Sequence, residues 1–211
     1  MRSFFKTEFT NLYVFLQETG NETTIISLAA LFLTLGRYHP IWNDWFSSIF
    51  YYALLPVLVI VLWLWGNPLK FGLGLGNVRI WTVYVAITCL VAIPILYVAS
   101  RLPAFQAYYR TEKFSLISHF LIYLGTLFGS EFLFRGFMLF GLKERFREGS
   151  IFIQMIPFVL VHFSKPEIET LSTIVTGIYF GYVCYRSNSF WPAFIIHMFI
   201  NVFFVAAVNL L

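Results

Sequence analysis

Residues 115–141, SLISHFLIYLGTLFGSEFLFRGFMLFG, decide the fold. A helix that spans a bilayer needs about 20 mostly apolar residues, and in this run the only Asp, Glu, Lys or Arg residues are Glu131 and Arg135. Their spacing of four places both side chains on one helix face, where they can form an ion pair. Because a charge at the bilayer centre costs about 2.5–3.5 kcal/mol on the insertion scale, the pair is a functional candidate. The alternative is a structural salt bridge that allows both charges to be buried.

The composition of the whole chain also indicates a membrane protein. Of the 211 residues, 59% are hydrophobic types, 21% are aromatic and 11% are charged, whereas a soluble domain has about 25% charged and 45–50% apolar residues. Such a chain lacks the polar residues that would coat a soluble core, so we expect lipid to solvate its surface. This composition excludes a disordered protein, a nucleic-acid binder and an ordinary cytosolic enzyme.

Six further apolar runs accompany the first, and together they predict an all-α membrane helix bundle of about seven transmembrane helices. The expected spans are 23–41, 46–65, 79–100, 115–141, 151–163, 168–185 and 189–210. Gly36 to Pro40 interrupt the first span early. The Gly-rich connector at 66–77 is expected to be a turn at the membrane interface.

These runs divide the chain into three segments and suggest an orientation. The segments are a polar or amphipathic N-terminal segment (1–22), N-terminal transmembrane helices (23–114) and a helical core that carries the polar motifs (115–211). Besides Arg135, which is inside a span, eight Lys and Arg residues lie on the N-terminal side of the membrane and five on the other. Cytoplasmic loops carry an excess of Lys and Arg, so we predict a multi-pass membrane protein with a cytoplasmic N-terminus. A re-entrant first span would reverse this orientation.

Two other predicted spans carry polar residues, also at a spacing of four. His162 follows Phe158 by four residues, and Asn201 follows His197 by four. Glu131 and these three polar residues lie eight to twelve residues from the span ends that face one membrane surface, or about 12–18 Å at ~1.5 Å per helical residue. We therefore expect them to meet as a polar intramembrane chamber. Considered alone, a histidine such as His162 is more often a core residue whose hydrogen bonds are satisfied. His197 and Asn201 alone would more often form a hydrogen bond between helices.

The residue types of this expected chamber suit hydrolysis within the membrane. A carboxylate beside a histidine can activate water, and a second histidine with an asparagine can stabilise an oxyanion. Alternatively, Glu131, His162 and His197 can hold a divalent metal such as zinc with an open position. The residues leave both possibilities open, a zinc cofactor or none. Proton or ion transport uses the same residue types, although no paired broken helices or inverted repeat is visible.

Three motifs in the second half of the chain resemble the CPBP family of intramembrane proteases. That family contains type II CAAX prenyl endopeptidases and bacteriocin-processing or self-immunity proteins, and its pattern is EExxxR, then FxxxH, then HxxxN on successive helices. The corresponding residues here are Ser130, Glu131 and Arg135, then Phe158 and His162, then His197 and Asn201. The resemblance covers about residues 115–205.

This resemblance implies an endopeptidase that hydrolyses a peptide bond of a membrane-associated substrate, prenylated or not. The implied partners are a peptide or lipidated peptide and membrane lipid, with no nucleic acid. The implied roles are Glu131 as the base or the group that orients it, and His162 as the residue that activates water. His197 and Asn201 would stabilise the oxyanion, and Arg135 would fix the Glu131 carboxylate.

One departure from the family pattern concerns its first glutamate, which is usually assigned to activate water and is Ser130 here. A serine is not a general base at neutral pH without help. Glu169, seven residues after His162, is a candidate replacement if its loop folds back into the chamber. The alternative is that Glu167 and Glu169 are solvated at a helix N-terminus. A second interpretation of Ser130 is a catalytically inactive family member that acts as a membrane-bound immunity, binding or scaffold protein.

Overall fold

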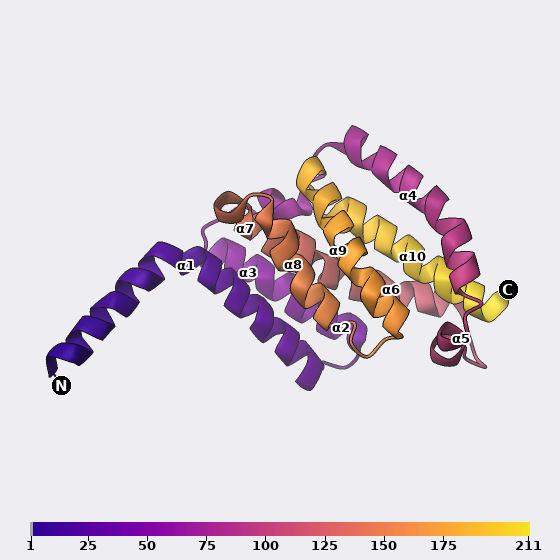
Figure 1. The fold of residues 1–211 in the computed structure, drawn as a ribbon, viewed down its shortest axis with the longest axis horizontal. Coiled ribbons are helices and arrows are strands. Elements are labelled where there is room, and N and C mark those ends of the chain that lie inside the picture. Colours follow the sequence, from indigo (N-terminus) through magenta and orange to yellow (C-terminus); the bar gives the residue numbers. More distant parts are fainter. Residues whose placement is uncertain (1) are drawn as a thin grey trace.

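The computed structural model describes residues 2–211, and these form helices and no strand (Figure 1). The predicted all-α architecture is therefore confirmed for this part of the chain. In order, the elements are α1 (Arg2–Tyr38), α2 (Asp44–Ser48), the π-helical η1 (Ile49–Leu54), α3 (Leu55–Leu62), the π-helical η2 (Leu69–Leu73), α4 (Val78–Ala99), α5 (Pro103–Tyr109), α6 (Leu116–Glu131), the π-helical η3 (Phe132–Met138), α7 (Leu139–Phe146), α8 (Gly149–Leu160), α9 (Glu167–Ser187) and α10 (Trp191–Leu210).

All seven expected spans overlap helices, but the count of seven membrane crossings is not confirmed. Within residues 2–211, four helical stretches are long and apolar enough to cross a bilayer: Asp44–Leu62, Leu69–Ala99, Leu116–Phe146 and Trp191–Leu210. Of the other expected spans, α8 has 12 residues, about 18 Å of helix against a hydrocarbon core of about 30 Å. The first turn of α9 carries Glu167 and Glu169, and its last turn carries Arg186, which shortens its apolar part.

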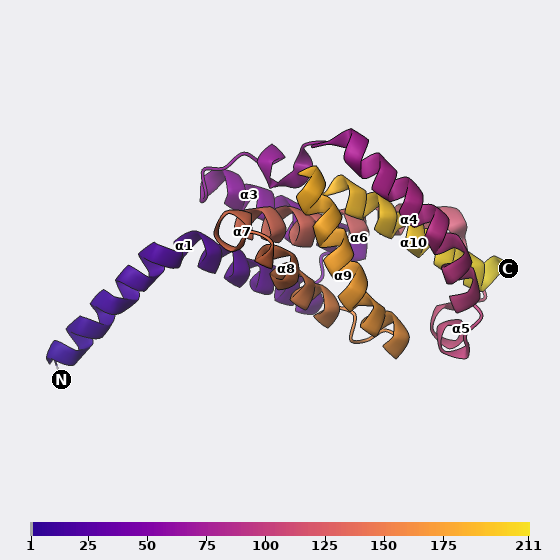
Figure 2. The same ribbon diagram turned by 45° about the horizontal axis from the view of Figure 1, so that its top comes forward.

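The helices form one bundle from which the start of α1 projects. In Figures 1 and 2 this part of α1 extends away from the other helices, and the C-terminus lies at the opposite end. Residues 4–18 are exposed, whereas Ile25, Ala29 and Phe32 are buried in the core. Their spacing of four and three places them on one helix face. α1 is thus one continuous helix whose second half alone packs against the bundle.

The centre of the bundle is the stretch from Glu131 to Leu139, in which every residue is buried. A helix that is hydrophobic all round belongs in an interior, and this stretch contains Phe132, Phe134 and Phe137, each at most 1% exposed. The π-helical turn η3 begins directly after Glu131, and such turns occur often at functional sites. The fold therefore encloses Glu131 and the residues that follow it on all sides.

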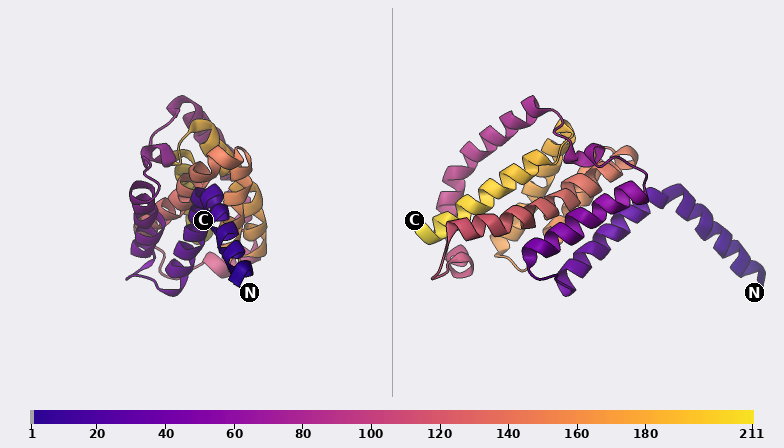
Figure 3. Two further views of the ribbon diagram at one scale, coloured as in Figure 1. Left: turned by 90° about the vertical axis from the view of Figure 1, so that its left-hand side faces the viewer. Right: turned by 180° about the vertical axis from the view of Figure 1, so that it is seen from behind.

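The Gly-rich connector at 66–77 packs on the turn between α9 and α10, as the right-hand view of Figure 3 shows near the upper end of the bundle. The Phe190 N–H donates to the Gly72 carbonyl at 3.0 Å. Gly76 has a φ of 56°, and a Cβ there would overlap the carbonyl oxygen of Ser187. The positive φ and the close approach both require glycine, so the chain turns tightly here, although the connector also contains the π-helical η2. Its location at the membrane interface stays a prediction.

Two glycines allow α6 to approach α2 closely. Gly125 and Gly129 are four residues apart on one face of α6, and small residues at this spacing let helix backbones pack tightly in membranes. A Cβ on Gly125 would overlap the Trp45 indole, and a Cβ on Gly129 would overlap the backbone carbonyl of Ser48. The Ser48 hydroxyl donates to the Thr126 carbonyl at 2.7 Å, which fixes the two helices in this register.

We predict that Gly129→Ala lowers the free energy of unfolding by about 1–3 kcal/mol, because the new methyl group has no space beside the backbone of α2. Thermal unfolding of the detergent-solubilised protein measures the change. Gly20→Ala is the matched control, since a Cβ at Gly20 meets nothing within 4 Å, and it should leave stability equal or slightly higher. Equal effects of the two substitutions would contradict close packing of α6 on α2.

Candidate active site

Glu131 and Arg135 form the ion pair that their spacing predicts. Arg135 Nη1 donates to Glu131 Oε1 at 3.1 Å, and both side chains are 0% exposed. Burying two charges is costly unless each has a partner of opposite sign and good hydrogen bonds. The pair makes this burial possible, yet Glu131 Oε2 and Arg135 Nε and Nη2 have no hydrogen-bond partner within residues 2–211. The carboxylate thus keeps one oxygen available for another donor.

Aromatic rings surround the Arg135 guanidinium. Its central carbon lies 3.9 Å from the centroid of the Phe158 ring, 5.3 Å from that of Phe180 and 5.6 Å from that of Phe134. A cation over an aromatic face within about 6 Å is attracted by the ring quadrupole, more strongly when it is desolvated. Rings from η3, α8 and α9 therefore compensate part of the desolvation of Arg135 and exclude water from its side of the pair.

His197 binds the same carboxylate oxygen from α10. Its Nδ1 lies 2.6 Å from Glu131 Oε1, and a carboxylate accepts hydrogen bonds, so Nδ1 carries the proton. In a neutral imidazole the lone pair is then on Nε2. The His197 side chain is 16% exposed, and its ring packs edge-on to Phe158 at 5.9 Å between centroids. The structure thus brings Glu131 and His197 together, as the sequence predicts, and orients the imidazole.

His162 lies in the turn after α8, beside Phe158. Its Nδ1 is 2.7 Å from the Phe158 carbonyl oxygen, so Nδ1–H donates and Nε2 again has the lone pair. The ring contacts the Phe158 ring at 4.7 Å between centroids. Phe158 therefore contacts both half-buried histidines, and the two have the same tautomer.

Asn201 pairs with a residue that the sequence analysis missed. Its Oδ1 lies 2.8 Å from Nε2 of His119 in α6, while no contact between Asn201 and Glu131 is present in the described structure. A histidine inside a membrane span is by itself a functional candidate, so the position of His119 in an expected span could have identified it from the sequence. His119 was overlooked because it belongs to none of the three motifs.

Glu169 lies in a separate cluster at the start of α9. The Tyr109 hydroxyl donates to its carboxylate at 2.7–2.8 Å, and Lys165 Nζ donates to the Tyr109 oxygen at 2.8 Å. Burial, followed by Glu169, raises the pKa of Tyr109, which keeps the hydroxyl protonated. Burial lowers the pKa of Lys165, while Glu169 opposes that shift. Glu169 thus has partners of its own in the part of the chain that is described, and none of them is Glu131 or a histidine.

The residues do not fit the metal alternative. No three His, Cys, Asp or Glu side chains within residues 2–211 lie close enough together to hold a metal ion. His197 directs its Nδ1–H to Glu131, and His162 directs its Nδ1–H to the Phe158 carbonyl. The expectation that Glu131, His162 and His197 jointly hold zinc is therefore not supported.

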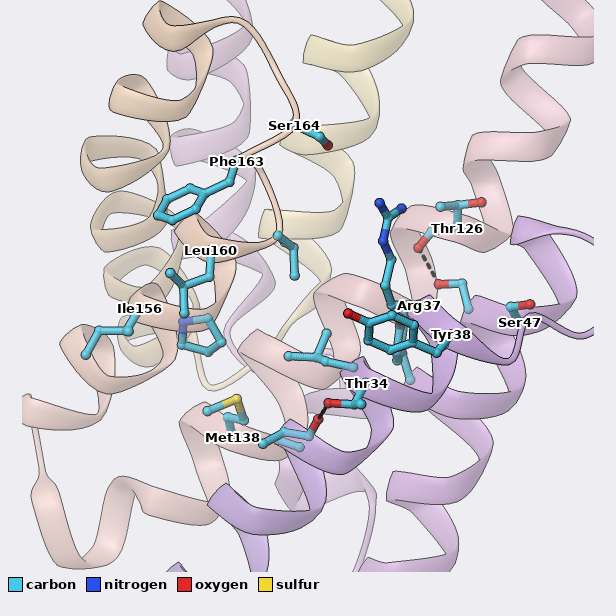
Figure 4. Close-up of a pocket in the computed structure, with 18 of the residues that line it drawn as sticks. Thr34, Arg37, Tyr38, Ser47, Thr126, Met138, Ile156, Leu160, Phe163 and Ser164 are labelled. Carbon is cyan, nitrogen blue, oxygen red and sulfur yellow. Dashed lines mark hydrogen bonds between the residues drawn. The ribbon is translucent and has the colours of Figure 1, made fainter.

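A pocket of about 950 Å³ lies between α1, α2 and α8, next to the His162 turn (Figure 4). Val161 and Phe163, which flank His162 in sequence, line it together with apolar residues of α1 and α8. Figure 4 shows Arg37 and Ser164 toward one end and Met138 toward the other. A second, almost wholly apolar pocket of about 580 Å³ lies between α6 and α10. The four residues expected to form the chamber line neither pocket: Glu131, His162, His197 and Asn201. An open chamber around them is therefore not confirmed.

Comparison with known proteins finds a family match in the second half of the chain. Residues 112–203 match the family described as Rce1-like, type II CAAX prenyl endopeptidase. The resemblance that the motifs predict is confirmed. This matched segment contains His162 and His197, the buried pair Glu131 and Arg135, and Asn201. No curated protein and no solved structure matches the chain. The family match and the four apolar helices together indicate an integral membrane protein.

We predict that Arg135→Met lowers the free energy of unfolding by about 3–5 kcal/mol, because it leaves the Glu131 carboxylate buried without a counter-charge. The double variant Glu131→Gln/Arg135→Met has no buried charge at either position and should regain most of this loss. Thermal unfolding in one detergent compares the three proteins. A single variant as stable as wild type would contradict the burial of a charged pair.

Proposed function

We propose that this protein is an intramembrane endopeptidase in which Glu131 and His197 together activate water. The observation that carries the proposal is the 2.6 Å hydrogen bond between His197 Nδ1 and Glu131 Oε1. A carboxylate that holds Nδ1–H fixes the tautomer and orientation of an imidazole, so that Nε2 can act as a general base. In the family pattern a glutamate at the position of Ser130 is assigned to activate water. If Glu131 and His197 activate water together, no glutamate is needed at that position.

The proposed reaction is a hydrolysis with two proton transfers. His197 Nε2 takes a proton from a water molecule while the water oxygen bonds to the scissile carbonyl carbon. The resulting tetrahedral oxyanion accepts hydrogen bonds, and Asn201 Nδ2 is the donor that we assign to it. The imidazolium then gives its proton to the leaving nitrogen as the C–N bond breaks. Arg135 keeps the Glu131 carboxylate ionised and in place throughout.

His162 has a supporting role in this proposal. Since its Nδ1 is bound to the Phe158 carbonyl, its Nε2 can accept the second hydrogen of the attacking water and so position that water. The proposal thus retains His162 as a water-binding residue but moves the base to His197, which the sequence analysis assigned to the oxyanion. Glu169 remains a catalytic candidate, and the variant Glu169→Gln tests it in the same cleavage assay.

The proposed substrate is a membrane-associated peptide, prenylated or not. The 950 Å³ pocket offers apolar walls for the hydrophobic part of such a substrate, directly beside the turn that holds His162. Pockets of about this size enclose drug-sized or lipid-like groups. We also propose a cytoplasmic N-terminus, on the excess of Lys and Arg among the loops on that side.

The single experiment that tests this function is cleavage of a panel of fluorogenic peptides, prenylated and unprenylated, by the purified protein in detergent. We expect His197→Ala and Glu131→Gln to reduce kcat/KM by about 10²–10⁴-fold, the range for loss of general acid–base catalysis. Glu169→Gln decides whether that carboxylate takes part. If no peptide is cleaved, or if His197→Ala cleaves as fast as wild type, the proposal fails.

Ser130→Ala is the matched control for that experiment. The Ser130 hydroxyl donates to the Leu127 carbonyl of its own helix at 3.2 Å, so we expect kcat/KM to stay within about twofold of wild type. A loss as large as that of Glu131→Gln would instead place the reactive group at Ser130.

A chelator separates water activation by the histidine from water activation by a metal. Because three ligand side chains do not come together in the described structure, we expect EDTA or phenanthroline to leave the rate unchanged. Loss of activity on chelation, with recovery on addition of zinc, would show that the metal alternative is right.

The alternative function is that of a catalytically inactive family member that serves as an immunity, binding or scaffold protein. The observation that favours it is Ser130 in place of the first family glutamate. Under this alternative Glu131→Gln, which preserves shape but leaves Arg135 without its counter-charge, should keep the biological function intact when equal amounts of folded protein are compared. Under the peptidase proposal the same substitution abolishes it, so one variant distinguishes the two.

A further inference from the structure

His119 forms a second polar pair below the Glu131–His197 pair. It lies on α6, as Glu131 does, and its partner Asn201 lies on α10, one helical turn after His197. The same two helices are therefore joined twice, each time between a residue of α6 and a residue of α10. Both α10 residues face α6 because they are four apart.

The hydrogen bond between His119 and Asn201 has a defined direction. Nε2 of His119 is 2.8 Å from Oδ1 of Asn201, and an amide oxygen only accepts, so the imidazole donates. This bond occupies the oxygen of the amide and leaves its NH₂ group for other acceptors. Asn201 Nδ2 makes no hydrogen bond within the described residues 2–211.

The His119 ring is held in place by its own neighbours. The Tyr123 ring lies over it at 4.3 Å between centroids with a tilt of 32°, and the Phe114 ring lies at 5.7 Å. Stacked and tilted aromatic contacts at these distances restrict ring rotation. The donor that holds Asn201 is thus fixed from α6 and from Phe114, two residues before that helix begins.

We propose that His119 is a positioning residue that orients the Asn201 amide so that its N–H groups face the reacting carbonyl oxygen. The inference rests on the proposed peptidase function and adds a residue outside the three family motifs. A primary amide can rotate by 180° with little change in shape, and a donor aimed at the developing oxyanion works only when its orientation is fixed in advance. A donor to Oδ1 supplies that fixation, since the NH₂ group in the same place would meet an N–H.

The test separates orientation from folding by two substitutions at His119. His119→Leu removes the donor, and His119→Gln replaces it with an amide N–H that can reach the same oxygen. We expect His119→Leu to reduce kcat at least tenfold with KM unchanged, and His119→Gln to restore kcat to within about threefold of wild type. Equal losses in both variants, or a rise in KM without a fall in kcat, would overturn the inference.

A second measurement tests the hydrogen bond whether or not the protein cleaves any peptide. In protein labelled with ¹⁵N-histidine, the His119 signals should show a protonated Nε2, and Asn201→Ala should shift them. An unprotonated Nε2, or His119 signals that do not change in Asn201→Ala, would refute the inference whether or not the protein cleaves peptides. If the signals behave as expected while wild type cleaves nothing, the proposed function has failed, and with it the catalytic role of the pair.

Discussion

The structure depends on one buried carboxylate. Glu131 is fully enclosed in a bundle whose four longest apolar helical stretches are suited to lipid, and an unpaired charge there would cost several kcal/mol. Two partners of different kinds offset the cost of burying the Glu131 charge. Arg135 supplies a permanent positive charge from the same helix, and His197 supplies a hydrogen bond from α10.

Other features of the fold follow from enclosing this group. The π-helical turn after Glu131 is surrounded by helices and connectors, including the Gly-rich stretch that packs on the α9–α10 turn. Glycines on α6 bring α2 close, and aromatic rings from α8 and α9 cover the guanidinium. The resulting ion pair is fully buried, and a setting of low dielectric constant strengthens electrostatic interactions with a developing oxyanion.

The sequence was sufficient to predict the helical fold, the ion pair and the approach of His197 to Glu131. These depend on local periodicity and on the high cost of a lone charge in lipid, both of which are visible in one chain. The number of membrane crossings was not predictable, because the lengths of α8 and of the apolar part of α9 depend on where turns fall. The partner of Asn201 was not predictable either, since its identity depends on the register between α6 and α10. The contacts of Glu169 and Lys165 with Tyr109 join segments 60 and 56 residues apart and likewise follow from tertiary packing.

The most direct test of this account is a double-mutant cycle on kcat/KM between Glu131 and His197. If the carboxylate acts by holding the imidazole, the variant Glu131→Gln/His197→Ala should be no slower than the slower single variant, because groups that act as a unit are strongly non-additive. If the two losses multiply, Glu131 and His197 act independently, and the buried pair is not the group that activates water.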